Sequence, residues 1–210
     1  FGARYQLFKQ VYSHKTTKAI EYMLSDALNL VDPILKISEK CMTPQGLTKL
    51  TDSIFQFIEL SEDPDPRFKQ AQDILTRMKK RHLYKMAVEA MQQQGKALIL
   101  PTAADVAKCS NGKVTETDII VEQLTLNYCM KDKNPVDSVW FFNQWGSSEV
   151  YHIPRCEVSL LLPSQFCEMK FRVFVRNPDL LLAAREAVLQ WIKTVPTIKP
   201  IIPSPSKPIQ

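Results

Sequence analysis

The first third of the chain is patterned as helix, because apolar residues recur there every three or four positions. This period runs through residues 3–31, and Asp32-Pro33 is expected to end it, since the residue before a proline avoids helical backbone. Thr43 and Asp65 each precede a proline, which is typical of the residue that caps the start of a helix. The sequence therefore predicts one long helix followed by two shorter ones.

From about residue 83 onward, short runs of β-branched and aromatic residues replace the helical period. Residues 118–130 and 136–145 predict two strands, and residues 131–135 predict a hairpin turn that joins them. Residues 169–176 alternate apolar and polar side chains, as a half-buried strand does. We therefore expect a small sheet in this part of the chain.

Two further helices and a proline-rich tail complete the pattern. Residues 102–109 and 180–193 have helical spacing, and residues 97–100 are a brief apolar run between them and the first helices. Prolines recur from Pro196 to the end of the chain, which favours an extended or disordered tail.

These elements together predict an α+β fold in three parts. We expect residues 1–85 to be helical, residues 86–194 to form a mixed α+β lobe, and residues 195–210 to be a flexible tail. With 210 residues, of which 45% are hydrophobic, the chain is long enough for one large domain or two small ones.

Glycine and histidine are scarce, which limits the chemistry that the chain can carry. Its five glycines are scattered, so the sequence excludes a glycine-rich loop that cradles phosphate. Its three histidines lack the spacing of a metal pair, so we expect no self-contained histidine metal site. Because Phe1 already lies within helical periodicity, we expect a piece of a longer protein without a complete catalytic centre.

Charge and cysteine usage change this picture little. The net charge of +5 gives a mild preference for anionic partners. The five cysteines show no CxxC spacing, which favours free thiols in a reducing intracellular compartment over disulfides or zinc. No run approaches the ~18 apolar residues of a membrane span, so we expect no membrane insertion.

The first predicted helix carries one candidate binding surface. Arg4, Phe8, Tyr12 and Lys15 fall near one face at spacings of three and four, where arginine offers a fork to phosphate and tyrosine a ring and hydroxyl to a sugar or base. On a regular helix His14 lies ~200° around from Tyr12, so two sites could be served from one helix. The alternative, ordinary polar positions on an amphipathic helix, stays open.

A second basic cluster lies where the third helix gives way to the first strand. If the chain is extended after Arg81, then Arg81, Leu83 and Lys85 point to one side, and the two cations could hold a phosphate while the base lies against the leucine. The alternative is a solvated helix end whose cations complement the helix dipole.

The tail contains a proline-directed phosphorylation motif at Ser204-Pro205, in a stretch without acidic residues, where a phosphate would reverse the local charge. A chance Ser-Pro pair is the alternative reading. The sequence offers no constellation of nucleophile and base, and we nominate no catalytic residue.

Four collinear blocks, together with the opening stretch from Arg4 to Lys15, resemble the vertebrate family of SAM-and-HD-domain dNTP triphosphohydrolases. The resemblance covers nearly the whole chain and implies a C-terminal portion: the last helices of an HD-type domain, then a regulatory lobe. The matching blocks are residues 47–60, 73–85, 118–137 and 158–191.

The resemblance implies a reaction and a set of ligands. The parent would hydrolyse dNTP to deoxynucleoside and triphosphate, with Mg²⁺ or another divalent metal held by the HD core upstream of this chain, and with GTP and dNTP as allosteric activators. Arg4 matches a contact to substrate phosphate and Tyr12 a contact to the sugar, whereas His14 and Lys15 match an allosteric dNTP site. We expect the chain alone to be inactive.

Arg81, Leu83 and Lys85 match a trio that lines the family's guanine-nucleotide activator site at a subunit interface, where nucleotides assemble a homotetramer. Ser204 lies near a regulatory Thr-Pro site of the family. The resemblance also implies a nuclear location, with some protein in the cytoplasm, and a role in antiviral defence.

Three positions depart from the family pattern. Phe8 replaces a histidine near the substrate base, Ser13 replaces a glutamine close by, and Gln144 replaces a lysine at an allosteric phosphate contact. These departures leave a second hypothesis open: a non-catalytic module that binds single-stranded nucleic acid or a protein through its positive charge and the aromatic residues 140–145.

Overall fold

A four-stranded antiparallel sheet forms the centre of the computed structural model, which describes residues 1–92, 99–146, 149–158, 163–195 and 197–201. The strand order is β2-β3-β1-β4, so β3 and β1 are the inner strands and β2 and β4 lie at the edges. The strands are β1 (Lys85–Gln92), β2 (Ile119–Asn127), β3 (Cys167–Val175) and β4 (Ile198–Ile201).

Helices precede, interrupt and follow the strands, so the predicted α+β class is confirmed. The short 3-10 turns η2 (Glu116–Asp118), η3 (Pro135–Ser138) and η4 (Pro178–Leu180) join them, and a π-helical turn, η1 (Phe8–Tyr12), follows the first helix. The helices are α1 (Gly2–Leu7), α2 (Lys15–Leu35), α3 (Ile37–Cys41), α4 (Pro44–Leu47), α5 (Ser53–Leu60), α6 (Pro66–Lys79), α7 (Ala103–Cys109), α8 (Arg155–Val158) and α9 (Leu181–Thr194).

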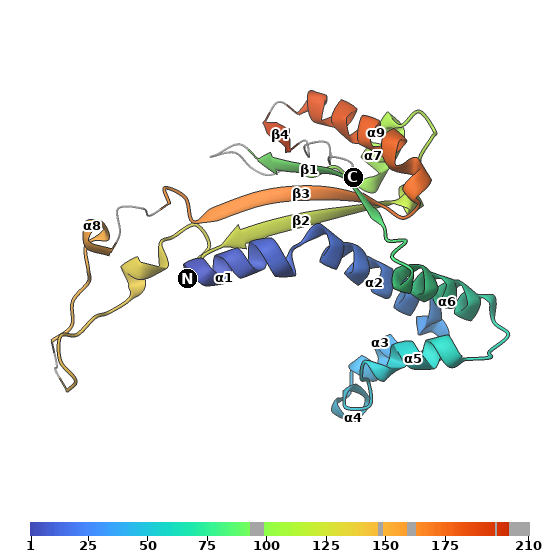
Figure 1. The fold of residues 1–210 in the computed structure, drawn as a ribbon, viewed down its shortest axis with the longest axis horizontal. Coiled ribbons are helices and arrows are strands. Elements are labelled where there is room, and N and C mark those ends of the chain that lie inside the picture. Colours follow the sequence, from blue (N-terminus) through green and yellow to red (C-terminus); the bar gives the residue numbers. More distant parts are fainter. Residues whose placement is uncertain (93–98, 147–148, 159–162, 196, 202–210) are drawn as a thin grey trace, which may run out of the picture.

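The two faces of the sheet are covered by different helices (Figure 1). Successive side chains of a strand point to opposite faces, and β3 illustrates this alternation. Its residues Phe171, Val173 and Val175 are fully buried in the core that α7 and α9 share with the sheet. Phe174 points the other way, into a smaller cluster with Ala19 and other residues of α2. The helices α1 and α2 therefore cover the second face.

A separate helical layer packs beside α2. The side chains of Ala27 and Val31 on α2 are fully buried against Phe68 and Leu75 of α6, and Ile58 of α5 closes the cluster. The short helices α3, α4 and α5 lie at the end of α2 that is remote from α1 (Figure 1). Thus α2 belongs to both layers and connects the sheet to the helical part.

The first helix differs from its prediction at both ends. It is not continuous over residues 3–31: the π turn is followed by a break at Ser13, after which α2 starts afresh. Asp32-Pro33 does not end it either, because the proline lies in the last turn of α2, which runs to Leu35 and ends where Lys36 adopts a left-handed conformation (φ 53°). A proline so near the end costs only one main-chain hydrogen bond.

The predicted hairpin is wrong. Residues 119–127 do form β2, but the partner of β2 is β3, with Ile119 opposite Val175, and residues 136–145 contain only η3 and a single bridge between Phe141 and Tyr151. Residues Cys129 and Lys131 have positive φ and turn the chain away from the sheet. The segment between β2 and β3 therefore forms an arm that extends beyond the sheet (Figure 1).

The strand predicted at 169–176 exists, but it is not half-buried. As an inner strand, β3 buries both of its faces, including Lys170 and Arg172. The alternation of polar and apolar residues indicated solvent on one face, whereas these polar side chains pair with acidic residues from neighbouring strands.

The remaining elements follow the prediction more closely. Asp65 caps α6, Thr102 opens α7 with a capping box, and α9 lies where residues 180–193 predicted a helix. Thr43 caps a helix as expected, but the second helix is divided into α4 and α5. The run 97–100 falls partly outside the described residues. The three predicted part boundaries remain predictions.

The tail is more ordered at its start than the prolines suggest. Residues Ile198–Ile201 form β4, which pairs antiparallel with β1, with Pro200 opposite Ala90. Residues 196 and 202–210, among them Ser204, lie outside the described residues. In the described parts of the chain, no helix is long and apolar enough to cross a membrane, and Cys41, Cys109, Cys129 and Cys167 are free.

Candidate functional site

The outer surface of the first helical segment holds Arg4, Phe8 and Tyr12 in one stack. The guanidinium carbon of Arg4 lies 4.5 Å from the centroid of the Phe8 ring, and the Phe8 and Tyr12 rings are 5.2 Å apart with an angle of 51° between their planes. All three side chains are exposed. The structure thus brings together Arg4 and Tyr12, which the sequence predicted as substrate contacts, and Phe8 lies between them.

The π turn spaces these residues. The Ser13 amide donates to the carbonyl oxygen of Phe8 at 2.8 Å, which is the i→i+5 bond of a π helix. Such single π turns are uncommon and occur frequently at functional sites. Because the helix is broken at Ser13, between Tyr12 and His14, the angular relation expected for these two residues on a regular helix does not apply.

The opposite side of the same segment is anchored to the sheet by Tyr5. Its ring stacks on Tyr128 with centroids 4.7 Å apart, and its hydroxyl donates to the Glu168 carboxylate at 2.5 Å. Lys9 donates to the Tyr5 hydroxyl at 2.9 Å and to Glu168 at 3.2 Å. This inner contact fixes the orientation in which the outer stack faces solvent.

The charge of Glu168 is stabilised in this arrangement. Partial burial by itself would raise the pKa of Glu168, but the hydrogen bonds from Tyr5 and Lys9 outweigh it, so the pKa lies below its usual value. The pKa of the Tyr5 hydroxyl is shifted in the opposite direction: burial, together with the hydrogen bond to the Glu168 carboxylate, raises it. The anchor therefore holds a carboxylate and a neutral phenol over the ordinary pH range.

The break between the first two helices exposes a second group of candidate residues. His14 caps α2, because its Nδ1 accepts a hydrogen bond from the Thr16 amide at 3.2 Å. Lys15 is the first residue of this 21-residue helix, and both side chains are exposed. A helix N-terminus attracts anions through its free amides and its dipole. The geometry is therefore compatible with phosphate, as the sequence predicted for these two residues.

A buried charge network lies directly beneath this break, and the sequence analysis did not find it. Arg172 donates both to the Ser13 carbonyl oxygen and to Glu89, and its Nη1 lies 3.8 Å from Glu122. Lys18 approaches Glu122 from α2 at 3.8 Å. Burial raises the pKa of Glu122 despite both cations. The only signal for this network in the sequence was the alternation of polar and apolar residues on β3, which the sequence analysis interpreted as exposure of one face to solvent.

The third group, Arg81, Leu83 and Lys85, does not share one surface in this chain. Arg81 and Lys85 are exposed, but Leu83 is buried against Ala19 and Met23 of α2. The expected period of two fails because Arg81 is not extended: its φ is 63°. The two cations therefore remain candidate phosphate contacts, whereas Leu83 is a core residue in the single chain.

Arg81 occupies the left-handed position that closes α6. Its amide donates to the Met78 carbonyl oxygen at 3.0 Å, and the next amide, of His82, donates to the carbonyl oxygen of Arg77 at 2.9 Å. This is the Schellman pattern, in which glycine is the usual residue because a Cβ is unfavourable there. The chain thus keeps a cation at a position where glycine would be more stable.

A second network, also missed from the sequence, holds the segment after Arg81 in place. Tyr84 donates to Asp26 on α2 at 2.8 Å, and Arg176 at the end of β3 binds the same carboxylate through two nitrogens at 2.6 and 3.0 Å. Burial and the bond to Asp26 raise the pKa of Tyr84, so the hydroxyl remains a donor. Asp26 on α2 and Arg176, which directly follows β3, therefore position Tyr84 in the backbone between the two candidate cations.

The remaining predicted residues stand apart from these groups. Gln144 is exposed on the arm, near the exposed rings of Trp140, Phe142 and Trp145. Ser204 lies outside the described residues.

Among the residues that the structure describes, no group of three or more His, Cys, Asp or Glu side chains could hold a metal ion. The described part of the chain therefore provides no set of three such metal ligands.

Comparison with known proteins agrees with the resemblance seen in the sequence. The HD associated region family matches residues 2–132. A deoxynucleoside triphosphate triphosphohydrolase SAMHD1 homolog of Dictyostelium discoideum is 38% identical over 181 residues, covering 85% of this chain and 35% of that protein. Proteins named deoxynucleoside triphosphate triphosphohydrolase SAMHD1 from mouse and human are each 32% identical over 213 residues, covering 91% of this chain and 32% and 34% of their own lengths.

The chain spans about a third of the length of these curated relatives. A putative HD domain-containing protein of Acanthamoeba polyphaga mimivirus is also similar, at 26% identity over 208 residues. The family match extends from α1 through β2, and so includes the three groups of candidate residues around the break and at the end of α6. The chain therefore belongs to the HD associated region family and is similar to a portion of the SAMHD1-like deoxynucleoside triphosphate triphosphohydrolases.

Proposed function

We propose that this chain is the C-terminal regulatory and oligomerisation part of a dNTP triphosphohydrolase that GTP and dNTP activate. The observation that carries the proposal is the arrangement around the break at Ser13. An arginine–aromatic stack lies before the break, and an anion-attracting helix start with His14 and Lys15 lies directly after it. Two nucleotide-binding surfaces can therefore share one rigid backbone connection.

The surface before the break would contact substrate. Arg4 can donate to phosphate oxygens through its fork, and the Tyr12 ring and hydroxyl can contact a sugar. Phe8 holds the guanidinium against its ring face. Because Phe8 cannot donate or accept a proton, its role in this chain would be to orient Arg4 and to offer a stacking surface.

The surface after the break and the end of α6 would bind the activators. His14 and Lys15 would hold one dNTP, and Arg81 and Lys85 would hold GTP between subunits of a homotetramer. The described residues include no ion-pair partner for Arg81 or Lys85, so both cations are available for phosphate. Coupling between sites then means that effector binding and assembly stabilise each other.

Hydrolysis itself would depend on residues outside this chain. By the family resemblance, residues of an HD core outside this chain would hold a divalent metal, whose chemistry there would be that of a Lewis acid. The residues of this chain would bind phosphate and sugar, and would transmit assembly. A nuclear location and modification at Ser204 belong to the same proposal and await direct measurement.

Sedimentation velocity on the purified chain tests the regulatory part of the proposal. With GTP and dATP present, we expect the sedimentation coefficient to increase, and we expect Arg81→Ala and Lys85→Ala to abolish that increase. Lys80→Ala is the matched control, because Lys80 is equally exposed and adjacent but belongs to the end of α6 rather than to the candidate pair. Absence of nucleotide-dependent assembly, or its survival in both variants, would contradict the proposal.

An activity assay tests whether hydrolysis depends on residues outside this chain. Purified chain supplied with dATP, Mg²⁺ and GTP is expected to release no triphosphate. Detectable hydrolysis, after exclusion of a contaminant by the Tyr12→Ala variant, would show that the chain contains a catalytic centre and would refute this part of the proposal.

A second candidate function rests on the exposed aromatic residues of the arm. Trp140, Phe142 and Trp145 are all at least half exposed, and Trp145 is 91% exposed. Bases of a single strand can stack on such rings. An oligonucleotide affinity that falls with salt and with Trp145→Ala, but survives Arg81→Ala and Lys85→Ala, would favour this function.

A further inference from the structure

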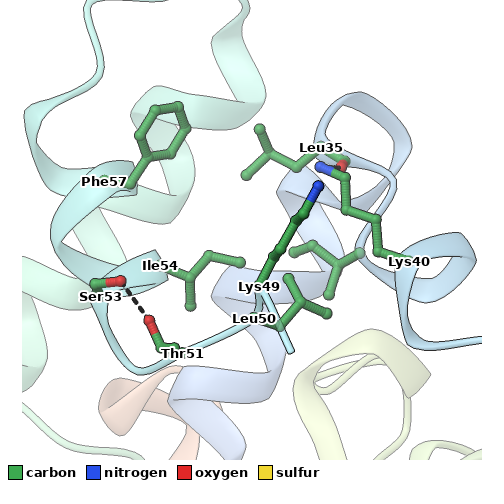
Figure 2. Close-up of a pocket in the computed structure, with 9 residues that line it drawn as sticks. Leu35, Lys40, Lys49, Leu50, Thr51, Ser53, Ile54 and Phe57 are labelled. Carbon is green, nitrogen blue, oxygen red and sulfur yellow. Dashed lines mark hydrogen bonds between the residues drawn. The ribbon is translucent and has the colours of Figure 1, made fainter. Parts of the chain in front are cut away.

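A pocket of about 250 Å³ lies at the end of α2 that is remote from the Ser13 break (Figure 2). It is formed where the last residue of α2 meets α3, α5 and the connection 48–52. None of the candidate nucleotide-binding residues lines this pocket. It is also separated from the two nucleotide surfaces by the length of α2 (Figure 1).

The floor of the pocket is apolar. Its apolar side chains project toward one another from three elements, as Figure 2 shows, and Phe57 closes one side with its ring half exposed. Thr51 and Ser53, whose hydroxyls are 2.6 Å apart, satisfy each other at the lower edge. The apolar lining residues are Leu35, Ile37, Leu50, Ile54 and Phe57.

Two lysines give the mouth of this pocket a positive charge. Lys40 is held in place because its Nζ donates to the carbonyl oxygen of Leu35 at 2.7 Å, at the negative end of α2. Lys49 also lines the pocket, and in the view of Figure 2 its side chain extends across the opening. The Lys40 ammonium keeps two further donors, and Lys49 keeps three.

Neither of these lysines has an acidic partner among the described residues. Other lysines of the helical layer do: Lys69 pairs with Asp73, and Lys79 pairs with Glu59. The sequence between Lys40 and Lys49 contains no acidic residue. Lys40 and Lys49 therefore place two cations without acidic partners beside an apolar floor.

We propose that this pocket binds a small amphipathic anion, with its apolar body on the floor and its carboxylate or phosphate at Lys40 and Lys49. The volume lies just below the range of about 300–1,000 Å³ typical of pockets for drug-sized ligands. A compact aliphatic or aromatic acid fits this space, whereas a nucleoside triphosphate exceeds it. The site is independent of the proposed function, since it shares no residue with either nucleotide surface.

Octanoate is a suitable probe, because it combines an eight-carbon body with one carboxylate. In a ¹H–¹⁵N NMR titration of the chain, we expect saturable shifts confined to residues 35–57. Acetate, which lacks the body, and 1-octanol, which lacks the charge, should each bind at least about fivefold more weakly. We expect Lys49→Gln to weaken octanoate about three- to fivefold, as for a single exposed ion pair.

Lys69→Gln is the matched control, since it removes the same charge from an exposed position on α6 outside the pocket, and it should leave octanoate affinity unchanged. The Lys49 side chain is exposed and makes no hydrogen bond or ion pair with the described residues, so its variant should retain the amide spectrum of the folded chain. The proposal is overturned if octanoate shifts residues elsewhere, if octanol binds as tightly, or if Lys49→Gln and Lys69→Gln behave alike.

Discussion

The guanidinium of Arg172, on an inner strand, donates a hydrogen bond to the main-chain carbonyl oxygen of Ser13, at the break between the first two helical segments. The two residues are 159 positions apart in the sequence. Both are buried, and Arg172 also binds Glu89 on the neighbouring strand. The centre of the sheet thus fixes the backbone that separates the two candidate nucleotide surfaces.

This relationship predicts a large loss of stability for Arg172→Met. The substitution preserves most of the side-chain volume but removes the guanidinium from the partly buried Glu89 and the buried Glu122. Breaking a buried charge network in this way costs about 3–5 kcal/mol. Urea denaturation monitored by circular dichroism measures the loss. The exposed Lys69→Met should change stability by less than about 0.5 kcal/mol, and an equally small change for Arg172→Met would contradict the role assigned to the network.

Arg81→Gly should have opposite effects on stability and on assembly. Arg81 has a φ of 63°, where a Cβ is unfavourable and glycine is not. We expect the free energy of unfolding to rise by about 0.5–1 kcal/mol, while GTP-dependent assembly is lost. Lys80→Gly is the control: Lys80 has a φ of −78°, so glycine brings no relief and should lower stability. If Arg81→Gly lowers stability as well, the side chain contributes more to the fold than the structure indicates.

Glu168→Gln should destabilise the chain at neutral pH and much less in acid. The pKa of Glu168 in the folded chain lies below its ordinary value of 4.5. A lowered pKa contributes stability that is fully present above the unfolded value and is lost as the pH falls through the folded value. We expect a loss of about 1–2 kcal/mol at pH 7, because charge-assisted hydrogen bonds from Tyr5 and Lys9 disappear, and a shrinking difference below about pH 4.5. The exposed Glu62→Gln should show neither effect, and a pH-independent loss for Glu168→Gln would refute this origin.

Local signals in the sequence predicted the capped starts of several helices well, but the end of α2 and the partners of strands poorly. Asp65 and Thr102 cap helices as predicted, because a cap requires only residues two or three positions away. The partner of β2 lies some forty residues further along the chain, and no nearby residue specifies it. The turn at Cys129 and Lys131, both with positive φ, directs the chain away without a glycine to indicate it.

In the candidate site, too, contacts between nearby residues were predicted and contacts between distant residues were not. Arg4, Phe8 and Tyr12 come together because a spacing of four places them on one side of the continuous helical segment formed by α1 and η1. Leu83 is buried because α2 covers it, and period-two spacing cannot report on a helix that packs from sixty residues away. The networks of Arg172 and of Asp26 were not predicted for the same reason: each joins residues from at least three elements that only the fold brings together.

Phe8→Ala tests whether the stack before the break acts as a unit. Phe8 is 40% exposed, so its removal should hardly affect stability. The Arg4 guanidinium would lose the ring that orients it, and a base or sugar would lose a stacking surface; contacts of this kind contribute about 1 kcal/mol or more each. We expect dATP binding to the chain, measured by isothermal titration calorimetry, to weaken about five- to tenfold, and Arg4→Ala to weaken it at least as much.

Leu7→Ala is the control, because Leu7 is also exposed in the first helical segment but makes no contact in the stack. Weakening by Arg4→Ala alone would mean that the arginine binds phosphate without help from Phe8, whereas equal affinity in all three variants would exclude this surface as the substrate contact.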